Sequence, residues 1–138
     1  PNQNGPAIEV TGRVERLSDG RFTCSGPMLA GIEANLGKMA VLRLPLAGRG
    51  EIMVVIGSNR AQTADQEIFR HIGCDPTQFG IVVVKSAIHF LADFEPIAEQ
   101  VLFAVAEGQN PCKLAAISYQ KIRDGVRLGP HGPAFKRS

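Results

Sequence analysis

A run of four consecutive β-branched residues, from Ile81 to Val84, most strongly constrains how this chain can fold. Such side chains favour extended backbone, and an apolar run without polar alternation is typical of a strand buried on both faces. The run ends at Lys85 and Ser86, and His89 follows three residues later. Open α/β sheets commonly bind ligands at the carboxyl ends of their strands. The sequence therefore predicts a buried strand at 81–84 with candidate functional side chains directly after it.

The first half of the chain has the pattern of antiparallel hairpins. Residues 8–24 alternate apolar and polar side chains around Ser18-Asp19-Gly20, which predicts a first hairpin. Residues 39–44 and 51–56 predict a second hairpin across a Gly- and Pro-containing connection. We therefore expect an α+β fold, with antiparallel β hairpins followed by a short α/β section around the buried strand at 81–84.

One helix is expected before that strand and a second helix after it. Asp65 precedes apolar residues at helical spacing, and Gly73 should end this first helix. After the strand, Asp93 is a candidate N-cap for a helix that closes near Gln100. The β-branched and aromatic residues at 101–105 then predict a further strand.

Length and composition describe one ordinary globular domain. The chain has 138 residues, 44% of them hydrophobic and 20% charged, and no apolar run approaches the roughly 20 residues that span a bilayer. We expect a linker at 1–7, a folded domain at 8–117 and a basic Gly/Pro-rich tail of the same domain at 118–138. Three scattered cysteines favour reduced thiols in a cytoplasmic protein.

The charge distribution argues against nucleic-acid binding. The net charge is +2, and residues 118–138 hold five basic residues against Asp124 alone. The rest of the chain therefore lacks the positive surface that nucleic-acid binders present. Neither nucleic acid nor a membrane is expected as a partner.

Lys85, Ser86 and His89 are the candidate binding residues. An ammonium group, a hydroxyl and free N–H groups at a strand end could bind a carboxylate or phosphate. In the alternative interpretation, Ser86 caps the next helix and Lys85 lies on the surface. His89 and Asp93 are four residues apart and could orient an imidazole, but no third ligand is spaced for a metal, and a structural role for His89 stays open. We assign no catalytic residue and no metal ligand.

The same residues carry a family resemblance. The chain resembles, over roughly Ile8 to Arg123, the C-terminal domain of the MlrC (microcystinase C) family of bacterial zinc metallopeptidases. The motifs that carry the likeness occur in order along the sequence: Gly12-Arg13-Val14, Ser18-Asp19-Gly20-Arg21-Phe22, Gly26-Pro27-Met28, residues 36–42, Gln62, Asp65, Phe69, Gly73, Asp75-Pro76, Val83-Val84-Lys85-Ser86, His89-Phe90, Phe94 and Pro96-Ile97-Ala98.

The resemblance implies a part of a larger enzyme. In that family a larger N-terminal domain carries the zinc, and known members open linearised microcystin peptides. This sequence has no counterpart of the metal-binding half, so we expect no cofactor in this chain and no activity from it alone. The expected role is to cover the active-site cleft and help bind a peptide-like substrate through Lys85, Ser86 and His89.

Other roles stay open at this point. The domain could be purely structural or serve oligomerisation, or it could bind a small molecule autonomously. The N-terminal catalytic domain of the same polypeptide is the expected partner, and a homo-oligomer is a further possibility.

Overall fold

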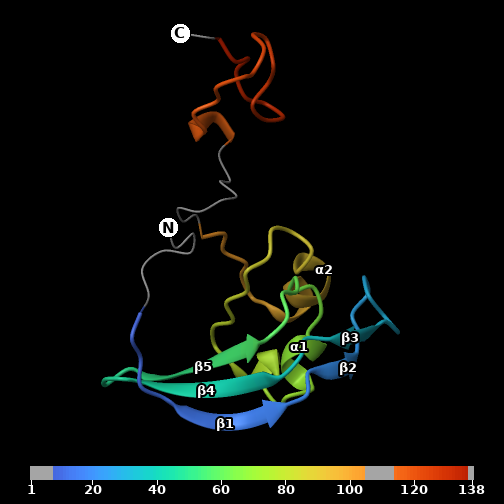
Figure 1. Cartoon of the computed structure of the whole chain (residues 1–138), viewed down its shortest axis with the longest axis vertical. Coiled ribbons are helices and arrows are strands. Elements are labelled where there is room, and N and C mark those ends of the chain that lie inside the picture. Colours follow the sequence, from blue (N-terminus) through green and yellow to red (C-terminus); the bar gives the residue numbers. More distant parts are fainter. Residues whose placement is uncertain (1–7, 105–113, 137–138) are drawn as a thin grey trace. The chain divides into compact units, whose positions relative to one another are not determined.

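The computed structural model describes residues 8–104 and 114–136, which belong to two compact units. The larger unit, Glu9–Val101, contains nearly all of the secondary structure (Figure 1). Its elements are β1 (Arg13–Ser18), β2 (Arg21–Thr23), β3 (Glu33–Asn35), β4 (Met39–Leu46), β5 (Gly50–Gly57), helix α1 (Glu67–Arg70), the 3₁₀ turn η1 (Pro76–Gln78), helix α2 (Leu91–Phe94) and the 3₁₀ turn η2 (Glu95–Ile97).

A three-stranded antiparallel sheet in the order β1-β4-β5 forms the framework of this unit. β4 and β5 pair continuously from Met39 opposite Gly57 to Leu46 opposite Gly50. The hairpin predicted over 39–44 and 51–56 is therefore confirmed, and it is slightly longer than expected. β1 pairs with the other edge of β4 and carries a bulge between Val14 and Arg16.

The first predicted hairpin is wrong in its pairing. β1 pairs with β4, whereas β2 leaves that sheet and pairs with β3 in a separate two-stranded ribbon. The turn at Gly20 causes the change of direction. Its backbone has φ +73° and its N–H donates to Ser18 Oγ at 2.9 Å, while its carbonyl accepts from Leu36 N at 2.9 Å. The chain thus turns toward β3 instead of folding back on β1.

The first predicted helix is confirmed as a single turn, α1. Asp65 Oδ1 accepts a hydrogen bond from Glu67 N at 2.9 Å, which satisfies a donor that the short helix leaves unpaired. Gly73 follows with φ +77°, the left-handed conformation that ends many helices.

The second predicted helix is shorter than expected. α2 and η2 cover Leu91–Ile97, and Ala98 is already extended at φ −102°, ψ 135°, so the helix does not reach Gln100. Asp93 lies inside α2 and is not its N-cap. Residues 101–104 form no strand, and residue 105 of that prediction lies outside the described residues.

The buried strand predicted at 81–84 is wrong. Residues 81–86 are irregular, and Ile81 and Val83 are 83% and 86% exposed. A β-branched run becomes a strand only where a neighbour can pair with it, and the sheet here consists of β1, β4 and β5 alone. The α/β section is therefore missing from the described part of the chain. The α+β class itself is confirmed, with antiparallel sheets and a few short helices.

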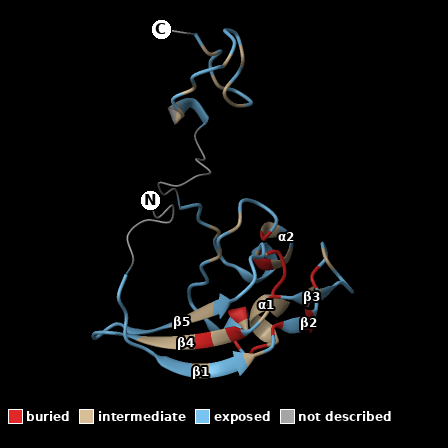
Figure 2. Cartoon of the chain, in the orientation of Figure 1, coloured by how far each residue is buried: buried red, intermediate tan, exposed pale blue. Residues whose placement is uncertain are grey.

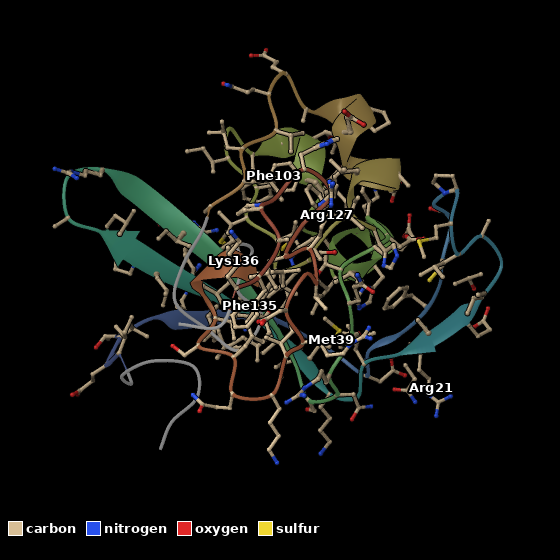
Figure 3. The ribbon with its side chains drawn as sticks, turned by 90° about the horizontal axis from the view of Figure 1, so that it is seen from above. Arg21, Met39, Phe103, Arg127, Phe135 and Lys136 are labelled. Atoms are coloured by element: carbon tan, nitrogen blue, oxygen red, sulfur yellow. The ribbon has the colours of Figure 1, made fainter. Side chains whose placement is uncertain are left out.

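The hydrophobic core lies between one face of the sheet and α1 (Figure 2). Its buried residues are Phe22, Cys24, Leu36, Met39, Val41, Ile72 and Cys74. Val41, at the centre of the sheet, has no exposed surface. Met53 and Val55 of β5 pack against this cluster from the same face. Figure 3 labels Met39 within the ribbon and Arg21 at its rim, in keeping with the burial of the first and the exposure of the second.

The smaller unit contains the 3₁₀ turn η3 (Leu114–Ala116) and a short antiparallel contact between Arg127 and Ala134. The rings of Tyr119 and Phe135 meet edge to face at 6.4 Å. Across residues 8–104 and 114–136, none of the helices has both the length and the apolar character needed to cross a membrane.

Candidate functional site

Lys85, Ser86 and His89 lie on the irregular segment that precedes α2. Lys85 and His89 are exposed, and Ser86 is half-buried. Gln62 Nε2 donates a hydrogen bond to Ser86 Oγ at 3.3 Å, which ties this segment to the chain that follows β5. α2 begins at Leu91, so Ser86 does not cap it. The structure thus displays an ammonium group and an imidazole on one short stretch of chain.

The ends of this segment are anchored in the unit. Pro76 of η1 is buried, and Phe90 is 7% exposed. Asp75 Oδ1 accepts from Thr77 N at 3.0 Å, and this hydrogen bond lowers the pKa of the Asp75 carboxyl. Because both ends are fixed, the exposed residues between them are presented by a defined loop and not by a free terminus.

A buried polar network, which the sequence did not reveal, connects α2, the helix that follows this segment, to α1. Asp65 is 1% exposed, and its Oδ2 accepts from Gly26 N at 2.8 Å while its other oxygen holds the start of α1. Asp93 Oδ2 accepts from Gln66 N at 2.6 Å. Gln66 Nε2 in turn donates to the Asp93 backbone oxygen at 2.5 Å. Asp65, Gln66 and Asp93 therefore join the loop at Gly26, α1 and α2.

This network accounts for Asp93 differently from the expected pair with His89. The Asp93 carboxylate bonds to Gln66, and no hydrogen bond joins His89 to Asp93 in the described structure. Gly26 leaves no room beside it, since a Cβ there would lie 2.8 Å from Asp93 Cγ and 3.0 Å from Asp65 Oδ2. The two carboxylates are therefore packed and bonded as structural groups.

The cysteines have the properties of core residues. Cys24 and Cys74 are free and buried, and burial raises the pKa of both thiols. The nearby Asp65 carboxylate raises the pKa of Cys24 further. Protonated, buried thiols are poor nucleophiles. Cys112 lies outside the described residues.

A groove beside β1 is the second polar feature that the sequence did not predict. Cavities of about 400 Å³ and 630 Å³ both reach Arg16 and Gly73. Glu15 and Glu51 form ion pairs with Arg43 at 2.8 Å and 2.7 Å, and the hydrogen bond from Arg13 lowers the pKa of Glu15. Lys85, Ser86 and His89 do not line either cavity.

The described residues contain no group of three or more His, Cys, Asp or Glu side chains arranged to hold a metal ion.

A comparison with protein families assigns the chain to one of them. A family model described as the MlrC C-terminus matches residues 1–121. This chain belongs to the MlrC C-terminal family. The predicted resemblance is thus confirmed, and most of the basic end of this MlrC C-terminal domain lies beyond the matched range. No curated protein and no solved structure matches the chain.

Proposed function

We propose that this MlrC C-terminal domain is the accessory part of a bacterial, cytoplasmic zinc metallopeptidase or amidohydrolase. It covers the active-site cleft and helps bind a peptide-like substrate, and the N-terminal domain of the same polypeptide holds the zinc that activates water. Membership of the family supports the larger enzyme. Among the residues of this domain that the structure describes, no set of His, Cys, Asp or Glu side chains is arranged to hold zinc.

The observation that carries this proposal is the anchored loop before α2. It exposes Ile81 and Val83 together with Lys85 and His89, although both of its ends are held in the unit. Large apolar side chains displayed next to a cation are typical of a surface that meets another molecule or domain. Lys85 would bind a peptide carboxylate through its charge, and His89 would hydrogen-bond to a polar group of the peptide.

Replacing Lys85 or His89 with alanine tests the binding role. In the full-length enzyme acting on a linearised microcystin, each substitution should raise KM by about tenfold, because a lost hydrogen bond to a charged group costs about 1.5 kcal/mol or more. Lys38→Ala is the matched control, since Lys38 is an exposed lysine elsewhere in the unit, and it should leave KM unchanged. Unchanged KM and turnover in both site variants would show that the loop does not bind substrate.

A purely structural role is the second candidate, and the exposure of Val83 favours it. If the loop packs on the catalytic half, Val83→Asp should destabilise the full-length protein by roughly 1–3 kcal/mol, because a carboxylate would be buried at the contact. The same substitution in the 138-residue chain should change the free energy of unfolding by under about 0.5 kcal/mol, since Val83 is 86% exposed there. Equal effects in both proteins would argue against packing, and Val83→Thr controls for the change of shape.

A further inference from the structure

The sheet β1-β4-β5 has a second face, turned away from the core. Side chains alternate along each strand, so the residues between the core positions Met39, Val41, Met53 and Val55 point the other way. The β1 bulge brings Val14 and Leu17 onto this same side, opposite Leu42 and Ala40. We define the outward face by its eight large aliphatic residues, Val14, Leu17, Leu42, Leu44, Leu46, Ile52, Val54 and Ile56.

The outward face lacks the composition of a solvated sheet face. Antiparallel sheets that face water on one side carry polar residues there, in alternation with the apolar residues of the core side. The paired segments of β4 and β5 contain two charged residues, Arg43 and Glu51. Both lie on the core side, because Arg43 is opposite Met53 and Glu51 is two residues before Met53. The outward face is aliphatic, yet Leu17 is 77% exposed and Ile56 46% exposed.

The size of the outward face limits what can cover it. Two strands of eight residues and one of six, about 4.8 Å apart and rising about 3.4 Å per residue, have a planar area of roughly 350 Å². Stable complexes between separate molecules bury about 800 Å² on each partner. Two free molecules would therefore be held weakly by this face. A tethered partner has an effective concentration in the millimolar range and can hold the same contact closed.

We propose that the outward face is covered by an aliphatic surface of the N-terminal part of the same polypeptide. This inference rests on the proposed function, which supplies that part, and it adds the surface through which the two parts join. The contact is formed by side-chain packing alone, because the outward face carries no charged residue to direct a polar partner.

Thiol labelling tests the covered face directly. Ile52→Cys places a thiol on the outward face, and Met28→Cys is the matched control off the sheet, because the two native side chains are 43% and 47% exposed. Both are made with Cys112→Ser, since Cys24 and Cys74 are buried. Labelling with a maleimide is followed in the 138-residue chain and in the full-length protein. We expect similar rates in the short chain, and at least about tenfold slower labelling of Ile52→Cys alone in the full-length protein.

Three outcomes would overturn the inference. Equal labelling of Ile52→Cys in both proteins would show an open face. Protection in the short chain that grows with protein concentration, with a dimer in sedimentation, would assign the face to a second copy. Protection there at every concentration would assign it to another part of this chain. Leu17→Cys, on the other edge strand, repeats the test at a second position. Because no activity is measured, failure of the Lys85 and His89 predictions leaves this result readable.

Discussion

Gly20→Ala should lower the free energy of unfolding of the 138-residue chain by about 2–5 kcal/mol. Gly20 is buried with φ +73°, a conformation that costs other residues roughly 1–2 kcal/mol. A Cβ at this position would also lie 2.0 Å from the carbonyl oxygen of Gly37. That atom belongs to the backbone, so the clash can be relieved only by moving the chain, at a further cost of roughly 1–3 kcal/mol.

Gly48→Ala separates the two contributions. Gly48 has nearly the same conformation, with φ +68°, but a Cβ there would meet nothing within 4 Å. This variant should therefore lose only the conformational cost, about 1–2 kcal/mol. Urea unfolding of both variants measures the difference. Equal losses would mean that the turn at Gly20 can relax to accept a Cβ atom. The pairing of β2 with β3 would then not depend on the close approach of Gly20 to the carbonyl oxygen of Gly37.

Asp65→Ala should destabilise the chain by about 3 kcal/mol. The Asp65 carboxylate is 1% exposed and accepts from Gly26 N and Glu67 N. Its removal leaves the buried Gly26 N–H and the half-buried Glu67 N–H without an acceptor, and each such loss costs roughly 1–3 kcal/mol. Asp65→Asn keeps one acceptor oxygen in place, so about half of the loss should be recovered. Thermal or urea unfolding followed by circular dichroism measures these changes.

Asp19→Ala is the matched control for Asp65. Asp19 also accepts from a backbone donor, Arg21 N at 3.1 Å, but it is exposed, and water can replace it. Its loss should cost under about 1 kcal/mol. If Asp65→Ala were no worse than Asp19→Ala, the hydrogen bonds of Asp65 would not hold the loop at Gly26 against the start of α1.

The sequence predicted local pairings better than long-range ones. The hairpin of β4 and β5 could be predicted because its two strands are adjacent in sequence and its register is continuous. The partner of β1 could not, because the alternation in residues 8–24 identifies strands without saying which strand lies next to them. The apolar run at 81–84 shows the same limit, since strand propensity is realised only where a neighbouring strand is available.

The candidate site divides in the same way. Lys85, Ser86 and His89 could be proposed because they are neighbours in sequence. The network behind them could not be predicted, because Gln66 and Asp93 are 27 residues apart and Gly26 is 39 residues from Asp65. From the sequence alone, Asp93 is a candidate N-cap and Asp65 precedes a helix, a position at which aspartate is favoured. Asp65 does bond to the first turn of α1, but its second bond depends on the tertiary fold.

The aliphatic side of the sheet bears on how the molecule is made. In a polypeptide that ends with this domain, the preceding part leaves the ribosome first and can fold before β1 emerges. If that part covers the outward face, as we propose, its covering surface is folded before the sheet forms. When the 138-residue chain is produced without the preceding part, Leu17 and Ile56 are exposed to other chains as soon as the strands form. Self-association then competes with folding.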